Sequence, residues 1–198
     1  MKRVLQTALL ADGTSDKALI PILRWTLRDL RPEGEFSDPQ FIFRRHRNLA
    51  ETTEAVLREY KPDILFVHRD AENAPMKERM KEMPVGDPLV PVVPVKMTEA
   101  WLLIDERAIR MAASNPNGTM RLDLPKWRDL EKIQAKTVLH ELLQAASGNT
   151  GRRRRSFNVE QAVHRVAELV EDYAVLRNLA AYEDFRHRLE ATLGQLGW

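Results

Sequence analysis

The feature that most constrains the fold is an alternation, over residues 4–95, between short apolar segments and segments with helical spacing. Strands are expected at residues 4–11, 40–44, 64–68 and 89–95, and helices between them at 16–30, 49–60 and 76–81. Parallel strands need such crossover helices, and strands that are apolar throughout, like ILFVH at 64–68, are typical of sheets covered on both faces. The pattern predicts an α/β fold with a mostly parallel, Rossmann-like sheet flanked by helices.

The chain changes character after its fourth apolar run. Pro91 and Pro94 interrupt that run, and because proline lacks a backbone donor they favour an edge strand. Beyond Thr98 no further strand is indicated, and helices are expected at residues 99–113, 130–147, 159–179 and 182–196. We therefore expect an α/β core over residues 1–113 and a helical C-terminal extension over residues 114–198, packed on the core.

Composition narrows the chemistry. The absence of cysteine excludes disulfides, thiolate zinc sites and a cysteine nucleophile, and it fits a cytoplasmic location. The chain has 31 basic and 29 acidic residues, so nucleic-acid affinity must come from local patches rather than from net charge. No apolar run approaches the roughly 20 residues that span a bilayer, and the opening segment is expected to be a strand rather than a signal peptide. No membrane association is expected.

Acidic residues follow three of the four expected strands. Asp12 and Asp16 come after the first strand, Asp70 and Glu72 after the third, and Glu99 shortly after the fourth. Open α/β sheets keep their sites at the carboxyl ends of their strands, so these carboxylates can converge. Converged carboxylates repel one another, and a cation relieves the repulsion. Oxygen ligands favour Mg²⁺ or Mn²⁺ over zinc, which makes a divalent-cation site the leading interpretation.

The same residues also fit purely structural roles. Asp12 and Ser15 suit the cap of the following helix, Asp16 suits its first turn, and Glu99 suits the first turn of a helix that Thr98 begins. The Asp-Ala-Glu segment at 70–72 also suits a solvated loop. Among the five histidines only His68 adjoins an acidic cluster, and a buried histidine with satisfied partners is its expected state.

Three motifs in order make the chain resemble the TOPRIM-like group, specifically the DUF4276 type. They are the segments DGTSD at 12–16, DAE at 70–72 and EAWLLID at 99–105, and the resemblance spans residues 1 to about 150. It implies a TOPRIM-like fold in which the first acidic residue is a general acid or base and the later acidic pair coordinates Mg²⁺ for phosphodiester chemistry. This chain carries Asp12 where the family has Glu and Glu72 where it has Asp.

The resemblance implies a role for each candidate. Asp70 and Glu72, with Asp16, would hold the metal, whereas Asp12 or Glu99 would transfer protons. The resemblance also matches Lys136 to a family lysine, which would neutralise a phosphate. The alternative for Lys136 is a solvent-facing position on its helix.

These roles predict a metal-dependent nuclease that acts on DNA or RNA. The run of Arg152, Arg153, Arg154 and Arg155 would contact nucleic-acid phosphates, with a solvated loop as the alternative. Two other functions stay open: a non-catalytic TOPRIM-like accessory protein that pairs with an ATPase of a defence system, and a phosphohydrolase of small nucleotides. A topoisomerase is disfavoured because every tyrosine falls in a helix-like segment.

Overall fold

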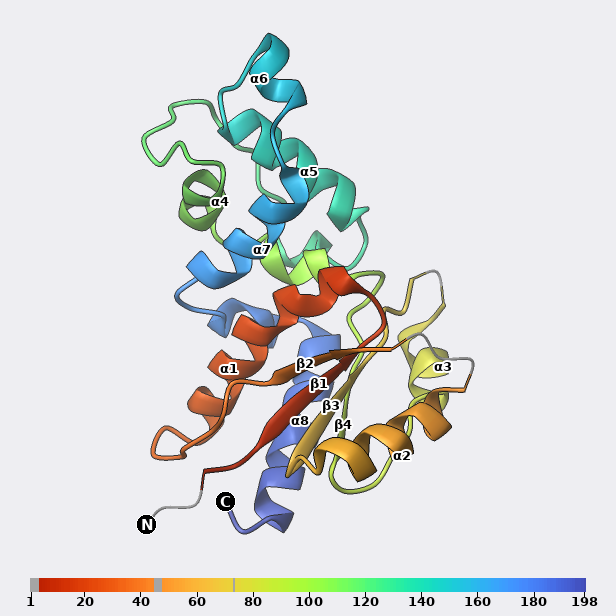
Figure 1. Ribbon diagram of the computed structural model, residues 1–198. Helices are drawn as coiled ribbons and strands as arrows, with labels where there is room; N and C mark the ends of the chain where they lie inside the picture. Colours follow the sequence, from red (N-terminus) through yellow and green to blue (C-terminus); the bar gives the residue numbers. More distant parts are fainter. Residues whose placement is uncertain (1–3, 45–47, 73) are drawn as a thin grey trace.

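The computed structural model describes residues 4–44, 48–72 and 74–198. Its centre is a four-stranded, all-parallel sheet with the strand order β2-β1-β3-β4 (Figure 1). The strands are β1 (Thr7–Ala11), β2 (Gln40–Phe43), β3 (Ile64–His68) and β4 (Leu89–Val92). The predicted α/β, Rossmann-like sheet is confirmed, and β4 lies at an edge, as Pro91 and Pro94 indicate.

Helices make up most of the remaining chain. The α-helices are α1 (Leu19–Leu30), α2 (Leu49–Tyr60), α3 (Met76–Lys81), α4 (Glu106–Ala112), α5 (Ala135–Ala146), α6 (Gly151–Arg155), α7 (Val159–Leu169) and α8 (Ala180–Gln195). The 3-10 helices are η1 (Thr14–Ala18), η2 (Thr98–Leu102), η3 (Trp127–Asp129) and η4 (Ala174–Asn178). Among the described residues, none of these helices has the length and apolar character needed to cross a membrane.

Both faces of the sheet are covered, and the alternation of side chains along each strand decides which helices they meet. On β3, Ile64 and Phe66 belong to the cluster built with α1 and α8, whereas Leu65 and Val67 belong to the cluster built with α2. His68 follows Ile64 and Phe66 in this alternation, so its side chain lies on the α1 side of the sheet. The complete burial of β3 accounts for its apolar sequence.

The helices α4, α5, α6 and α7 form a second group beyond the carboxyl ends of the strands (Figure 1). Helix α7 contacts α4, α5 and η1, while α8 returns along β4. One hydrophobic cluster contains Leu9 of β1, Leu139 of α5 and Phe185 of α8. The α/β part and the helical part therefore share a core.

Three strands are shorter than the sequence predicts, β2 by one residue because it ends at Phe43, and β1 and β4 by more. β4 ends at Val92, because Pro94 has no N–H to continue the ladder, although its carbonyl still accepts a hydrogen bond from the Ala71 N–H at 3.0 Å. Before β1, Leu5 forms only an isolated bridge with Phe36.

Two long predicted helices are each divided. The stretch 99–113 becomes η2 and α4, because the Asp105 carboxylate accepts a hydrogen bond from the Ala108 N–H at 3.1 Å and begins a new helix. The stretch 159–179 breaks after α7, where the buried Tyr173 donates its hydroxyl proton to the carbonyl of Ala167 at 2.6 Å. A local cap ends the helical periodicity in the first place, and the burial of Tyr173 in the core ends it in the second.

Candidate functional site

A cleft of about 330 Å³ lies beyond the ends of β1, β3 and β4. Five residues predicted for the site line it: Asp16, Asp70, Glu72, Glu99 and Lys136. The rest of its wall is mixed in polarity and consists of Ser15, Ala18, Lys96, Met97, Thr98, Leu102, Gln134 and Val163. The structure thus brings together acidic residues that follow three different strands, in the volume range of small-ligand sites.

Asp16 reaches the cleft because the chain turns sharply after β1. Its Oδ2 accepts a hydrogen bond from the Gly13 N–H at 2.6 Å, and its Oδ1 accepts one from the Ser15 hydroxyl at 3.3 Å. These bonds fix a carboxylate that is only 5% exposed. Asp16 therefore closes the turn into η1 and also presents a buried negative charge to the cleft.

His68 joins two of the carboxylates at the end of β3. Its Nδ1 lies 3.0 Å from the carbonyl of Val92 and must donate, because a carbonyl oxygen only accepts. Its Nε2 lies 3.5 Å from Oδ2 of Asp16 and 3.5 Å from Oδ1 of Asp70. Since an unprotonated Nε2 and two carboxylates would all be acceptors, a stable cluster needs one additional proton or another cation among these three groups. The expectation of a buried, hydrogen-bonded His68 is confirmed.

Asp70 is the most perturbed acid of the cleft. Its pKa is raised from 3.8 to about 7, chiefly by burial; His68 opposes the rise, and the negative charges of Asp16 and Glu99 add to it. The Thr98 hydroxyl donates to Oδ1 of Asp70 at 3.3 Å and favours the ionised form. Asp70 thus gains or loses its proton near neutral pH, where a small change in its surroundings alters its charge.

Glu99 and Lys136 face each other across the cleft. Glu99 lies in the first turn of η2 and is 7% exposed, so its structural role at a helix start and its place in the cleft coexist. Nζ of Lys136 lies 3.9 Å from Oε1 of Glu99 and 3.7 Å from Oε1 of Glu160 on α7. The lysine is therefore half-exposed between two carboxylates and can contact an anion that enters the cleft.

The rim of the cleft contains two residues in the left-handed backbone region. Glu72 has φ 54° and Lys96 has φ 62°, and the Glu72 N–H donates to the Lys96 carbonyl at 2.9 Å. Non-glycine residues adopt such angles at an energetic cost, and they concentrate at functional sites. Nζ of Lys96 donates to the carbonyl of Lys132 at 2.7 Å, which ties this rim to the segment before α5.

Asp12 does not line the cleft. Along β1 the side chains of Ala8 and Leu10 face the α2 side of the sheet, and Asp12 continues that alternation. Its Oδ2 lies 3.9 Å from Nε of Arg69, and its side chain is 42% exposed. Asp12 and Asp16 are close in sequence, but their side chains lie on opposite sides of the end of β1. The alternation along β1 places Asp12 on the α2 side of the sheet, and the turn after β1 places Asp16 in the cleft.

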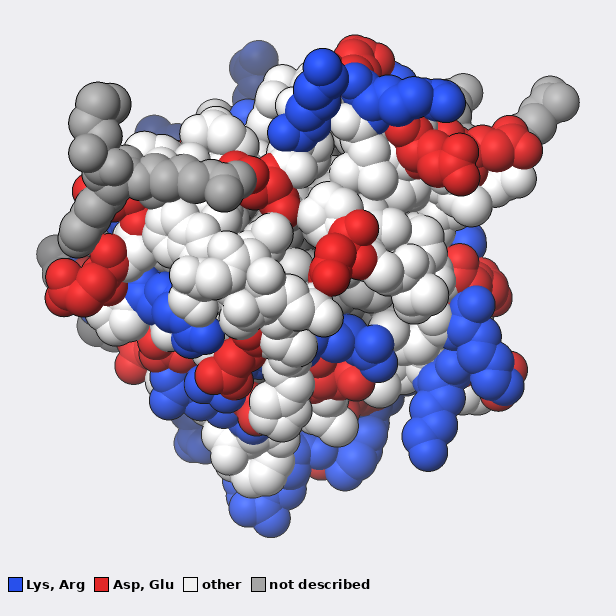
Figure 2. All heavy atoms as spheres, turned by 90° about the horizontal axis from the view of Figure 1, so that it is seen from below, with Lys and Arg blue, Asp and Glu red and all other residues white. Residues whose placement is uncertain are grey.

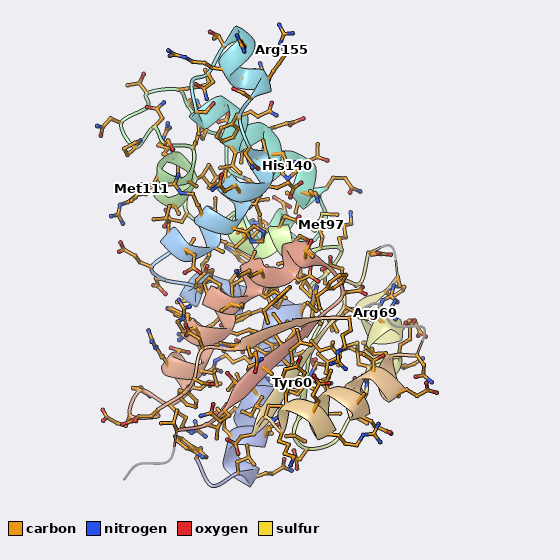
Figure 3. The ribbon with its side chains drawn as sticks, viewed as in Figure 1. Tyr60, Arg69, Met97, Met111, His140 and Arg155 are labelled. Carbon is orange, nitrogen blue, oxygen red and sulfur yellow. The ribbon has the colours of Figure 1, made fainter. Side chains whose placement is uncertain are left out.

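The arginine run lies far from the cleft. Residues 152–155, expected in a polar break, form the short helix α6. Figure 3 places Met97 of the cleft near the middle of the molecule and Arg155 at its far end, beyond α5. The arginines therefore do not contact the same point of a small ligand as Lys136.

Two features of the cleft wall were missed in the sequence, Lys96 and the contact of Thr98 with Asp70, as was one residue beside the cleft, Glu160, which contacts Lys136. Lys96 and Thr98 could have been found, because they follow the fourth strand. Glu160 could not, because only the packing of α7 on α5 brings it to the site.

The donor chemistry of the cleft suits a hard cation. Across residues 4–44, 48–72 and 74–198, no three histidine, aspartate or glutamate side chains are arranged to hold a metal ion together. Asp16 and Asp70 each have one oxygen 3.5 Å from Nε2 of His68, so in this structure the two carboxylates share a contact with a ring nitrogen. Mg²⁺ characteristically uses one or two carboxylates and keeps several waters, so this pair fits Mg²⁺ better than it fits zinc.

Comparison with known proteins finds no matching family model, no matching curated protein and no matching solved structure. The similarity to the TOPRIM-like group therefore stays a prediction from the three motifs.

Proposed function

We propose that the cleft binds Mg²⁺ or Mn²⁺ and hydrolyses phosphodiester bonds in a nucleic acid. The observation that carries this proposal is the convergence of Asp16, Asp70 and Glu99 from three strand ends, with Lys136 beside them. A cleft so rich in carboxylates repels phosphate unless a cation is bound, whereas a cation at the carboxylates would attract it.

The side chains divide the work. Asp16 and Asp70 would hold the cation, which when bound supplies Lewis-acid activation of phosphate and water. Lys136 would contact a non-bridging phosphate oxygen and stabilise the charge that develops there. His68 is buried behind the two aspartates, holds them in place through its Nε2, and does not contact the substrate in this arrangement.

Glu99 is the residue placed to accept a proton. It is buried in the wall of the cleft, and its Oε1 lies 3.9 Å from Nζ of Lys136. Asp12, the other candidate for this role, lies outside the cleft and pairs with Arg69. We therefore assign the general base to Glu99 in place of Asp12.

The test is cleavage of plasmid DNA, single-stranded DNA and RNA in Mg²⁺ and in Mn²⁺. We expect Asp70→Asn to lower the rate at least about 100-fold, because it removes a charge that acts on the cation. The matched control is Asp123→Asn, an exposed aspartate that pairs with Arg121 away from the cleft, and it should cleave like the wild type. Absence of cleavage by the wild type on every polymer, or equal rates for both variants, would contradict the proposal.

One observation favours a second function, a non-catalytic accessory protein that pairs with an ATPase. Asp12, the family's acid-base position, is paired with Arg69 instead of facing the cleft. On this alternative the protein binds Mg²⁺ but hydrolyses no polymer, and it forms a complex with an ATPase. A small-nucleotide phosphohydrolase would instead turn over nucleotides without binding polymers in a salt-dependent way.

A further inference from the structure

Helix α6 concentrates positive charge at the end of the molecule farthest from the sheet. Its four arginines, Arg152 to Arg155, are all exposed. No acidic residue occurs in the sequence between Glu141 and Glu160. Like charges at such close spacing repel one another and destabilise the free helix, which a bound polyanion would relieve.

The arginines of α6 differ from most others in the protein. Elsewhere arginines form ion pairs, among them Arg24 with Asp38, Arg44 with Glu59, Arg69 with Glu82, Arg107 with Glu171, Arg110 with Glu106 and Arg188 with Asp184. Within the described ranges, no carboxylate lies at ion-pair distance from an arginine of α6, and Arg154 instead donates to Oε1 of Gln144 at 3.4 Å. On the underside of the molecule, by contrast, basic and acidic side chains are interspersed (Figure 2).

A polar cleft of about 410 Å³ continues this charged surface between α4, α6 and α7. Arg153 and Arg165 both line it, and NH1 of Arg165 donates to the Ser114 hydroxyl at 3.2 Å. Further donors come from the Asn149 and Gln161 amides, and no acidic side chain lies among its lining residues. A site with several hydrogen-bond donors and no carboxylate suits the negatively charged oxygens of a phosphate.

Helix α7 connects this surface to the acidic cleft. Gln161 and Arg165 line the polar cleft, whereas Val163 of the same helix lines the acidic one, and Glu160 contacts Lys136. Gln161 and Arg165 lie two positions before and after Val163 and therefore on the opposite face of α7, so a strand bound at both clefts would pass around this helix.

We propose that α6 and the polar cleft beside it bind the phosphate backbone of a nucleic-acid strand. Arginine forks match phosphate oxygens in pairs, and four consecutive arginines on a short helix point to several sides, which suits a chain of charges rather than a single carboxylate. Delivery of this strand to the acidic cleft rests on the proposed function, but the binding itself does not.

The test measures binding without cleavage. A labelled 20-nucleotide single strand is titrated in EDTA over a series of salt concentrations, with fluorescence anisotropy as the readout. Arg152→Gln with Arg153→Gln should weaken binding at least about tenfold at low salt and reduce the slope of log K against log salt by about 1.4, or 0.7 for each lost contact. A dinucleotide should bind both proteins equally weakly.

The matched control removes the same charge elsewhere. Arg58→Gln with Arg188→Gln alters exposed arginines of α2 and α8, far from α6 in Figure 1, and should leave the affinity and the slope unchanged. Equal losses in both double variants, no binding by the wild type, or equal competition by polyglutamate would overturn the proposal. Asp70→Asn should still bind the strand, and a wild type that binds the strand but cleaves no polymer would reject the catalytic proposal alone.

Discussion

The acidic cleft and helix α6 hold charge in opposite ways. In the cleft, Asp16 and Glu99 are buried and in contact with cationic or titratable groups, and His68 lies between Asp16 and Asp70. On α6, four arginines are exposed without carboxylate partners among the described residues. Water solvates the arginines at little cost, whereas the cleft must compensate its charge within the protein.

This difference predicts that changes of charge in the cleft act on stability, whereas changes of charge on α6 act on binding. A change of charge in the cleft alters the free energy of unfolding, because water cannot compensate for it there. A change on α6 mainly alters encounters with other molecules, because solvent and salt already screen the charge. The three predictions below test this contrast, from the largest expected effect to the smallest.

The largest effect is expected from pH. The folded state keeps the Asp70 proton up to a pKa of about 7, whereas the unfolded chain releases it near 3.8. Between these values the unfolded state binds fewer protons, so this group makes the free energy of unfolding fall as pH rises, by on the order of 4 kcal/mol. Asp70→Asn removes this contribution, and urea unfolding from pH 4.5 to 8 should show it increasingly more stable than the wild type.

The control for this prediction is Asp123→Asn, since Asp123 is exposed and its removal should leave the pH profile unchanged. A wild-type profile parallel to that of Asp70→Asn would show that the cleft does not hold this proton. Addition of Mg²⁺ at pH 8 should stabilise the wild type more than Asp70→Asn, because a cation relieves the same repulsion.

The next effect is expected at His68. His68→Ala removes a buried partner of two carboxylates and leaves a cavity, so we expect a loss of about 3 kcal/mol in the free energy of unfolding at pH 8. At pH 5 the loss should be smaller, because Asp70 is then protonated. Arg107→Ala, which breaks an exposed pair with Glu171, should cost less than about 1 kcal/mol at both pH values. Equal losses of unfolding free energy in His68→Ala and Arg107→Ala would mean that the buried cleft and the exposed surface do not differ in their effect on stability.

The smallest effect is expected on α6. Arg155→Gln removes one like charge from the helix, so the free energy of unfolding should stay equal or rise by at most about 0.5 kcal/mol, and added salt should abolish the difference. Thermal and urea unfolding at 20 mM and 500 mM NaCl measure this. A fall of more than about 1 kcal/mol in the free energy of unfolding would mean that Arg155 stabilises the folded chain. It would contradict the expectation that charges on α6 have little effect on stability.

The sequence predicts the first half of the fold more closely than the second, for a physical reason. β3 and α2 begin and end where expected, since an apolar run covered on both faces and the Asn48 cap of α2 are local signals. The helix expected over 159–179 breaks where Tyr173 is buried against distant residues. Such a break depends on packing and carries no glycine or proline signal.

The site follows the same division. The strand ends predict that Asp16, Asp70 and Glu99 lie at one edge of the sheet, because parallel strands end together. The alternation of side chains along β1 is enough to predict that Asp12 faces the α2 side of the sheet, away from the cleft. The motif groups Asp12 with Asp16 by their spacing in sequence and does not carry this information. The raised pKa of Asp70 follows from burial, which no residue pattern specifies.

The prolines of β4 have a consequence for self-association. The carbonyls of Pro88 and Val92 accept hydrogen bonds from the N–H groups of Leu65 and Arg69 on β3. Because backbone groups alternate in direction along a strand, the backbone nitrogen of Pro91, which is opposite Val67, faces the open edge of the sheet. A strand of another molecule that approached this edge would find no amide proton there, which discourages edge-to-edge aggregation. β2, whose residues Gln40–Phe43 all have an amide proton, is then the edge at which a partly unfolded chain at high concentration would add a foreign strand.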